Sequence, residues 1–169
     1  MGAALAELAR RLPQGHDVTT ARGEYEISTD PARLDRAAVA RFLREEAYWS
    51  TGIPAAVVER AIDGSLVFGL YRSTEQVGFA RVVTDRATFA WLADVFVVAP
   101  HRGRGLGRWL VETVLAHPDL AGLRRVLLAT EDAHTLYERH GFRRLDDAQA
   151  ARFMTIEHDP ADVYGDTPE

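Results

Sequence analysis

The chain has 169 residues and a formal net charge of −5, and all 20 of its basic residues are arginine. This length suits one domain with a hydrophobic core. The absence of cysteine excludes disulfides, thiolate metal sites and a cysteine nucleophile, and the absence of lysine excludes a Schiff base. The excess acid lies in residues 157–169, so residues 1–156 are balanced in charge. Nucleic-acid binding therefore lacks its main electrostatic support.

The N-terminal part is predicted to contain a helical extension, one strand and two helices. The extension covers residues 1–22, and the strand covers residues 24–28. Asp30 is the expected N-cap of the first helix, with Pro31 at its first position. Apolar residues at helical spacing mark one face on each helix. These faces contain Leu34, Ala38 and Phe42 in the first helix, and Val57, Val58, Ala61 and Ile62 in the second.

The rest of the chain is predicted to form an antiparallel meander and then alternating helices and strands. Short polar breaks separate the meander strands, over residues 65–72, 76–84 and 88–98. The following elements are a helix over residues 104–117, a strand over 125–129, a helix ending before Gly141, and closing strands over 142–145 and 152–156. The strand–helix–strand unit should make a parallel pair by the right-handed crossover rule.

A glycine-rich turn from Arg102 to Gly107, between a strand and a helix, is the most informative stretch. A helix N-terminus presents backbone N–H groups that suit a phosphate, and glycines let the ligand approach closely. Arg108 adds charge to that of the two arginines in the turn. The G-x-G-x-G spacing and the apolar Leu127 and Leu128 argue against a dinucleotide fold, and the missing lysine argues against a P-loop. The alternative is that the three glycines only turn the chain and bind no ligand. It is disfavoured because three alternating glycines at the start of a helix lower its helix propensity.

Two motifs in this region resemble those of the Gcn5-related N-acetyltransferase (GNAT) superfamily. The family pattern Q/R-x-x-G-x-G/A after a central strand is matched by Arg102, Gly105 and Gly107. The second pattern, A-x-x-L-Y-E-x-x-G-F, is matched by Ala133, Leu136, Tyr137, Glu138, Gly141 and Phe142. The resemblance covers residues 24–156, and the stretch from Tyr48 through the meander is similar to an uncharacterised bacterial subgroup.

The resemblance implies an α+β fold with a mostly antiparallel twisted sheet. About six or seven strands, with a splayed parallel pair, would be flanked by about four helices. The chain would divide into an N-terminal helical extension over residues 1–22, an acetyltransferase domain over residues 23–156 and an acidic tail over residues 157–169.

The resemblance also implies acetyl-CoA as co-substrate. The pyrophosphate would lie on the turn amides, and the pantetheine arm would pair with the preceding strand like an added strand. The implied cofactor-binding residues are Val95, Phe96, Val97, Arg102, Gly103, Arg104, Gly105, Leu106, Gly107, Arg108, Thr130 and His134. Thr130 departs from the family, which often has asparagine there, and Ala99 replaces a common proline, which lies one residue later as Pro100. No metal is expected, because the histidines lack metal-ligand spacing.

The implied reaction, in which an amine attacks the thioester, needs three groups. The family resemblance assigns the backbone N–H of Val97 to polarise the carbonyl and Tyr137 to protonate the leaving thiolate. Asp94 is the first candidate for the base that takes a proton from the amine. The alternatives are Asp85, Asp132 and His134. The roles of Tyr137 and Asp94 have structural alternatives: Tyr137 as a half-buried helix aromatic, and Asp94 as a residue that starts a strand or links a turn.

The acceptor site is expected in residues 42–56 and in the turns over residues 72–76 and 84–89, where family members vary. Trp49 and Asp85 are the predicted acceptor contacts. Large aromatic residues such as Tyr48 and Trp49 more often belong to the core, and that interpretation is favoured for both. The acids Glu45, Glu46 and Asp85 in these segments would suit a cationic amine.

The sequence thus predicts a cytoplasmic N-acetyltransferase that acts on a primary amine of a small molecule or protein, by direct attack in a ternary complex. The second hypothesis is a CoA-binding module that senses or docks without turnover. Tyr137 favours the enzyme, because binding alone does not require a phenol. Neither nucleic acid nor a membrane is an expected partner, since no apolar run approaches the roughly 20 residues that span a bilayer. A homodimer is left open.

Overall fold

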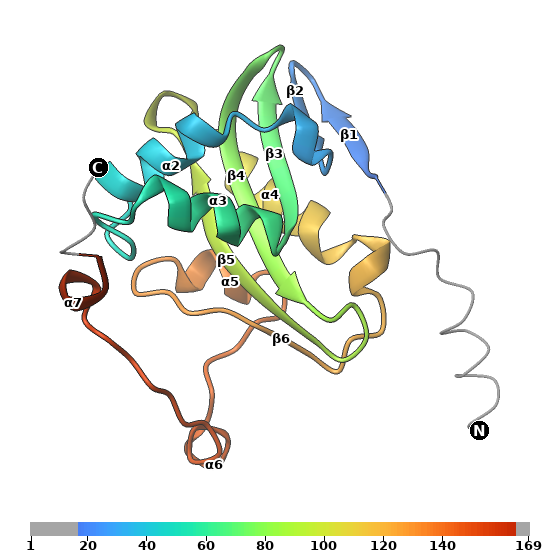
Figure 1. Ribbon diagram of the computed structural model, residues 1–169. Helices are drawn as coiled ribbons and strands as arrows, with labels where there is room; N and C mark the ends of the chain where they lie inside the picture. Colours follow the sequence, from blue (N-terminus) through green and yellow to red (C-terminus); the bar gives the residue numbers. More distant parts are fainter. Residues whose placement is uncertain (1–16, 165–169) are drawn as a thin grey trace.

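A computed structural model describes residues 17–164, which form one six-stranded sheet with helices on both faces (Figure 1). The strands lie side by side in chain order. They are β1 (Thr19–Arg22), β2 (Tyr25–Ser28), β3 (Leu66–Arg72), β4 (Glu75–Thr84), β5 (Phe89–Val97) and β6 (Arg125–Leu127). All neighbours are antiparallel except β5 and β6, which are parallel. The predicted mixed α+β fold with one parallel pair is therefore confirmed.

The longer helices cover the two faces of the sheet. In Figure 1, α2 (Arg36–Glu45) and α3 (Ala55–Asp63) lie in front of it, and α4 (Leu106–Leu115) lies behind. Three short helices follow: α5 (His134–Glu138), α6 (Asp147–Ala150) and α7 (Pro160–Tyr164). Asp35 caps α2 by accepting a hydrogen bond from the Ala38 N–H at 2.9 Å. Asp30, the predicted cap, instead caps the short 3₁₀ turn Pro31–Arg33.

Each face of the sheet has its own hydrophobic core, because successive strand residues point to opposite sides. On β3, Val67 packs with the α2 and α3 side and Phe68 packs with the α4 side. Phe42 of α2 stacks on Phe96 of β5, with ring centroids 3.8 Å apart and planes at 8°. This contact fixes the end of α2 against the strand that precedes the glycine-rich turn.

The two ends of the described chain differ from the predictions. The helical extension predicted over residues 1–22 lies mostly outside the described residues, and its last four residues form β1 instead. Gly23, at φ +61, permits the tight turn that pairs β1 with β2.

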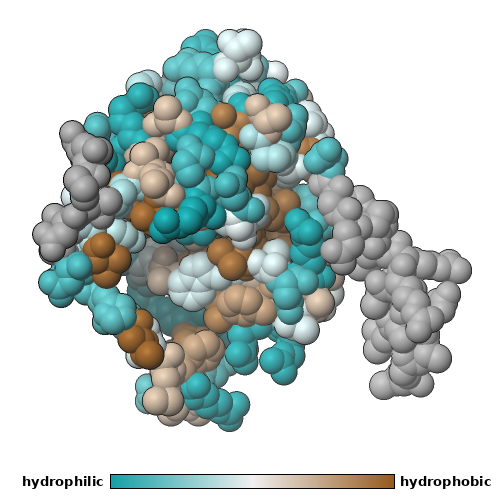
Figure 2. Space-filling view, in the orientation of Figure 1, coloured by the Kyte–Doolittle hydropathy of each residue, from teal (hydrophilic) through white to brown (hydrophobic). Residues whose placement is uncertain are grey.

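The closing strands predicted over residues 142–145 and 152–156 are wrong, since neither segment forms a strand. Between them, Asp146 and Gln149 form a capping box that starts α6, so local hydrogen bonds compete with strand pairing. Residues 143–164 form a C-terminal arm, and Figure 2 shows the surface hollowed beside it. Within residues 17–164, every helix is too short or too polar to cross a bilayer.

Candidate active site

A cleft opens where β5 and β6 diverge. Their parallel pairing runs from Phe89 opposite Arg125 to Trp91 opposite Leu127 and ends there, well before the end of β5. The resulting cleft of about 900 Å³ is lined by β5, the start of α4, the segment before α5, and the α2–α3 connection. The expected splay of the parallel pair is therefore present.

A bulge in β5 lies at the centre of the cleft. Phe79 pairs with Phe96 and Arg81 pairs with Ala93, so β5 carries an extra residue at this point. Asp94 lies within the bulge at φ +52, a conformation that few residues other than glycine adopt. Bulges of this kind redirect side chains and bend the strand.

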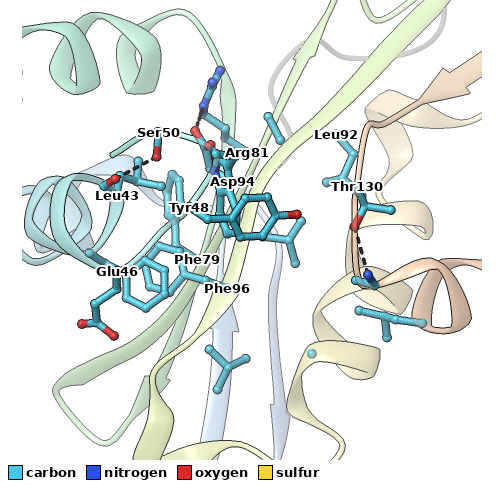
Figure 3. A pocket seen from close by; sticks show the side chains of 18 of the residues that line it. Leu43, Glu46, Tyr48, Ser50, Phe79, Arg81, Leu92, Asp94, Phe96 and Thr130 are labelled. Atoms are coloured by element: carbon cyan, nitrogen blue, oxygen red, sulfur yellow. Dashed lines mark hydrogen bonds and ion pairs between the residues drawn. The ribbon is translucent and has the colours of Figure 1, made fainter. Parts of the chain in front are cut away.

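The bulge aims the Asp94 carboxylate at two donors. Its Oδ2 accepts a hydrogen bond from Arg81 Nε at 2.5 Å (Figure 3), and its Oδ1 accepts one from Trp49 Nε1 at 3.0 Å. Arg81 also donates to the Ser65 hydroxyl at 3.3 Å. The carboxylate thus ties β4, β5 and the α2–α3 connection together at one point.

The backbone after the bulge has polar groups on the open edge of β5. The Val98 N–H donates to the Val77 carbonyl of β4 at 2.9 Å. Because successive residues direct their N–H and C=O groups to opposite sides of a strand, those of Val97 face the cleft. The Val97 carbonyl accepts a hydrogen bond from Arg102 Nε at 2.7 Å. The N–H of Val97 is left directed at the cleft.

The glycine-rich turn forms an open cradle at the start of α4. Gly103 and Gly105 both have φ +76, in the left-handed region that favours glycine. A Cβ at Gly103, Gly105 or Gly107 would meet no atom within 4 Å. Gly105 is the N-cap of α4 and supplies no side chain, so the amides of the first turn face this space. The cradle leaves room for a phosphate group, and Arg102 and Arg108 line the same cleft.

Tyr137 lies on the opposite wall of the cleft, on α5. Its side chain is buried, and its ring meets that of Phe142 edge to face at 5.8 Å. Burial, followed by the influence of Tyr48 and the charge of Asp132, raises the pKa of Tyr137 to about 12. The phenol is therefore protonated at neutral pH. Thr130 also lines this wall, and its hydroxyl accepts a hydrogen bond from the Ala133 N–H at 3.1 Å.

The end of the cleft away from the glycine-rich turn is built from side chains. Tyr48 and Trp49, in the α2–α3 connection, line it and are exposed. The Tyr48 hydroxyl lies 3.4 Å from Asp132 Oδ1 and accepts a hydrogen bond from the Glu131 N–H at 3.2 Å. Glu46, after α2, and Tyr164, at the end of α7, complete this wall. After the roles predicted from the sequence, we call this region, with Arg81, Asp94 and Asp132, the acceptor end, and the glycine-rich turn with residues 95–97 the cofactor end.

Most of the predicted site residues line the cleft, and three do not. Arg104, His134 and Asp85 are outside its lining. Asp85 closes the β4–β5 turn by accepting hydrogen bonds from the hydroxyl and N–H of Thr88 and from the N–H groups of Ala87 and Phe89. These bonds, that from the Thr88 hydroxyl first, hold the pKa of Asp85 well below its usual range. The turns over residues 72–76 and 84–89 likewise contribute nothing to the cleft lining.

Sequence reasoning missed Arg81 and Tyr164 as residues of this site. Arg81 lies in the middle of a strand, and only the bulge opposite brings Asp94 to it. Tyr164 lies in the segment predicted to be an acidic tail. Among residues 17–164, no cluster of three histidine, aspartate or glutamate side chains is arranged to hold a metal.

Comparison with known proteins identifies the family. Residues 63–144 match the family described as the acetyltransferase (GNAT) domain. A candidate acetyltransferase of Gibberella zeae is 33% identical over 162 residues, which cover 80% of this chain and 90% of that protein. The chain belongs to the GNAT superfamily. GNAT proteins use acetyl-CoA to transfer an acetyl group, and their fold accounts for the splayed strands and the glycine-rich turn.

Solved GNAT structures agree with this fold. A candidate GNAT acetyltransferase of Xanthomonas campestris pv. campestris is 46% identical, with a TM-score of 0.76 over 83% of this chain and 96% of that chain. Glucosamine-6-phosphate N-acetyltransferase of Arabidopsis thaliana is 17% identical, with a TM-score of 0.56 over 81% and 100%. A candidate acetyltransferase of Clostridium acetobutylicum, solved with acetyl-CoA, is 12% identical, with a TM-score of 0.57 over 79% and 94%. The last two show likeness of fold alone.

Proposed function

We propose that this GNAT protein transfers the acetyl group of acetyl-CoA to a primary amine, by direct attack within a ternary complex. The observation that carries the proposal is that one cleft holds three features: the open edge of β5, the glycine cradle and the protonated phenol of Tyr137. A module that only bound CoA would need the first two features and not the third.

The cofactor end would hold acetyl-CoA through backbone groups. The cradle amides at the start of α4, with Arg102 and Arg108, suit the pyrophosphate. The open edge of β5 over residues 95–97 suits the pantetheine amides, as in strand addition. When bound, acetyl-CoA supplies an acyl group that its thioester has activated toward attack.

The Val97 N–H and the Tyr137 phenol would act on different atoms of the thioester, the carbonyl oxygen and the sulfur. The N–H of Val97 faces the cleft by the alternation of strand residues, and Arg102 occupies the carbonyl of that residue and not its N–H. It is therefore a candidate donor to the carbonyl oxygen of the acetyl group. Tyr137 keeps its proton through the whole neutral range, so it can donate that proton to the departing thiolate.

Asp132 is a better candidate than Asp94 for the group that accepts the proton from the amine. Both oxygens of Asp94 already accept hydrogen bonds, from Arg81 and from Trp49. Protonation of Asp94 would weaken its ion pair with Arg81. Asp132 is exposed, and its charge acts on Tyr137, so we propose that it takes the proton, through water, and that Asp94 positions Trp49.

Replacement of Tyr137 by phenylalanine tests the enzyme directly. Tyr137→Phe should lower kcat by about 10²- to 10³-fold and leave the affinity for CoA nearly unchanged. The rate is measured by thiol release against a panel of amines, and the affinity by calorimetry. Tyr71→Phe is the matched control: burial raises its pKa to about 12 as well, but it lies on β3, outside the lining of the cleft.

The outcomes separate the proposed roles. If Tyr137→Phe leaves kcat unchanged, the phenol is not the acid. If the wild type binds CoA but releases no thiol with any amine, the chain is a CoA-binding module. Because the acid form of Tyr137 persists to about pH 12, kcat should show no decline up to about pH 10. A decline below about pH 9 would assign the acid to another group.

A further inference from the structure

The two ends of the cleft differ in charge. The cofactor end carries the positive end of α4 with Arg102 and Arg108. At the acceptor end, the charge of Arg81 is matched by Asp94, in an ion pair whose side chains are only 20% and 11% exposed. Two further carboxylates line this end, those of Glu46 and Asp132. In the described part of the chain, no basic side chain forms an ion pair with either, so the acceptor end is net negative.

Two exposed aromatic rings line the same end of the cleft as these carboxylates. Tyr48 and Trp49 are 47% and 42% exposed, and their rings meet at 89° with centroids 5.0 Å apart. The polar tip of each ring is held: Trp49 Nε1 donates to Asp94, and the Tyr48 oxygen accepts from the Glu131 N–H. In Figure 3, Tyr48 extends across the cleft toward the wall that contains Thr130. Fixed aromatic faces next to carboxylates are suited to hold an alkylammonium or guanidinium group.

We propose that the acceptor is a small aliphatic amine that carries a second cationic group besides the amine to be acetylated. This inference rests on the proposed acetyl transfer. The reacting amine must be neutral when it attacks, so a monoamine would leave the negative acceptor end without a matching charge. A second ammonium or guanidinium group, held by Glu46 and the ring faces, supplies that charge. Acceptors with a phosphate or carboxylate at this position are disfavoured by repulsion.

Each of the two carboxylates, Asp132 and Glu46, would contact a different nitrogen-containing group of such an acceptor. Asp132 lines the cleft just before α5, which carries Tyr137, and its charge contributes to the raised pKa of that phenol, so we assign it to the reacting amine. Glu46 projects from the wall formed by the end of α2, near Phe79 and Phe96 in Figure 3. Since both residues line one cleft, we assign one nitrogen of the diamine to Tyr137 and the other to Glu46.

A pair of amines of equal length tests this inference. With saturating acetyl-CoA, kcat/KM for 1,4-diaminobutane should exceed that for 1-aminobutane by about tenfold or more, as expected for one added charge contact in a partly exposed site. Because one ammonium group of the diamine lowers the pKa of the other, each kcat/KM is expressed per neutral reacting amine, from pKa values of the two amines obtained by titration. The preference should shrink as salt is raised, because exposed charges are screened. Glucosamine 6-phosphate is the third acceptor in the comparison, because it carries a negative phosphate where the diamine carries a second positive group.

Two neighbouring acids supply the matched variants. Glu46→Gln should reduce the diamine-to-monoamine ratio of kcat/KM by about tenfold. Glu45→Gln should leave the ratio unchanged, because Glu45 is exposed and outside the cleft lining. Equal rates with both amines, a preference for the amino-sugar phosphate, or an unchanged ratio in Glu46→Gln would overturn this inference and leave acetyl transfer standing. Failure to acetylate any amine, with CoA still bound, would overturn both.

Discussion

The cofactor end and the acceptor end of the cleft are built in different ways. The cofactor end comes from one continuous stretch, residues 95–108, and offers mostly backbone groups. The acceptor end collects side chains from the end of α2, from β4, from the loop before α5 and from α7. Backbone groups suit a ligand that is the same throughout the family, and side chains can change with the acceptor. Substitutions that close the cofactor end should abolish CoA binding, and substitutions at the acceptor end should change which amine is used.

The largest effect is expected from closing the glycine cradle. Gly105→Val should weaken CoA binding by more than about 100-fold, because the added side chain occupies the space that the phosphates need. Gly122→Val is a matched control, since Gly122 has the same φ of +76 and equally open surroundings, in the loop between α4 and β6. Calorimetry with CoA measures the binding, and thermal unfolding measures the strain.

Both variants should lose stability to a similar degree, by about 1–2 kcal/mol or more for a side chain forced into the left-handed region. The expected difference between them is therefore in binding alone. Retained CoA binding in Gly105→Val, or an equal loss in Gly122→Val, would contradict the assignment of the cradle.

A smaller effect is expected where β4 supports the cofactor strand. Gly78 lies opposite Val97, and a Cβ at Gly78 would be 2.8 Å from the Phe96 carbonyl oxygen. Because that neighbour is backbone, β5 must shift. Gly78→Ala should lower the free energy of unfolding by about 1–3 kcal/mol, measured by urea denaturation, and weaken CoA binding. At Gly64 a Cβ would be 3.4 Å from the Arg60 carbonyl. Gly64→Ala should therefore change stability less, and an equal loss would contradict the argument.

The smallest effect is expected at the acceptor end. Trp49→Phe removes the indole N–H that donates to Asp94 and keeps an aromatic ring. Loss of one such hydrogen bond, worth about 1 kcal/mol, should raise KM for the amine by about fivefold. The affinity for CoA should stay the same, since the cofactor end is untouched. Steady-state kinetics and calorimetry together check this, and a loss confined to CoA affinity would break the division between the two ends.

The same contrast explains which parts of the fold and of the site could be predicted from the sequence. The strand, the glycine-rich turn and the helix of the cofactor end were predictable because they are consecutive in the chain. The meander and the parallel pair followed from short turns and from the crossover rule. The ion pair between Arg81 and Asp94 could not be foreseen, because it depends on a bulge that shifts the register of two strands. Asp85 had the right charge for an acceptor contact, but local hydrogen bonds commit it to a turn.

The C-terminal region was the hardest to predict for a related reason. Residues 152–156 have an apolar composition typical of a strand, yet Met154 and Ile156 are 98% and 88% exposed. Nothing in the composition of residues 157–164 indicated that α7 would bring Tyr164 to the cleft. Contacts between segments so distant in the chain leave no local pattern.

The position of Tyr164 has a consequence for how this protein can diversify or be engineered. The C-terminal arm that carries it runs from α5 past the sheet without contributing a strand, and Tyr164 lines the proposed acceptor end. Chain added, exchanged or cleaved after α6 would alter access to that mouth while leaving all six strands in place. Fusion partners and affinity tags therefore belong elsewhere when acceptor preference is assayed.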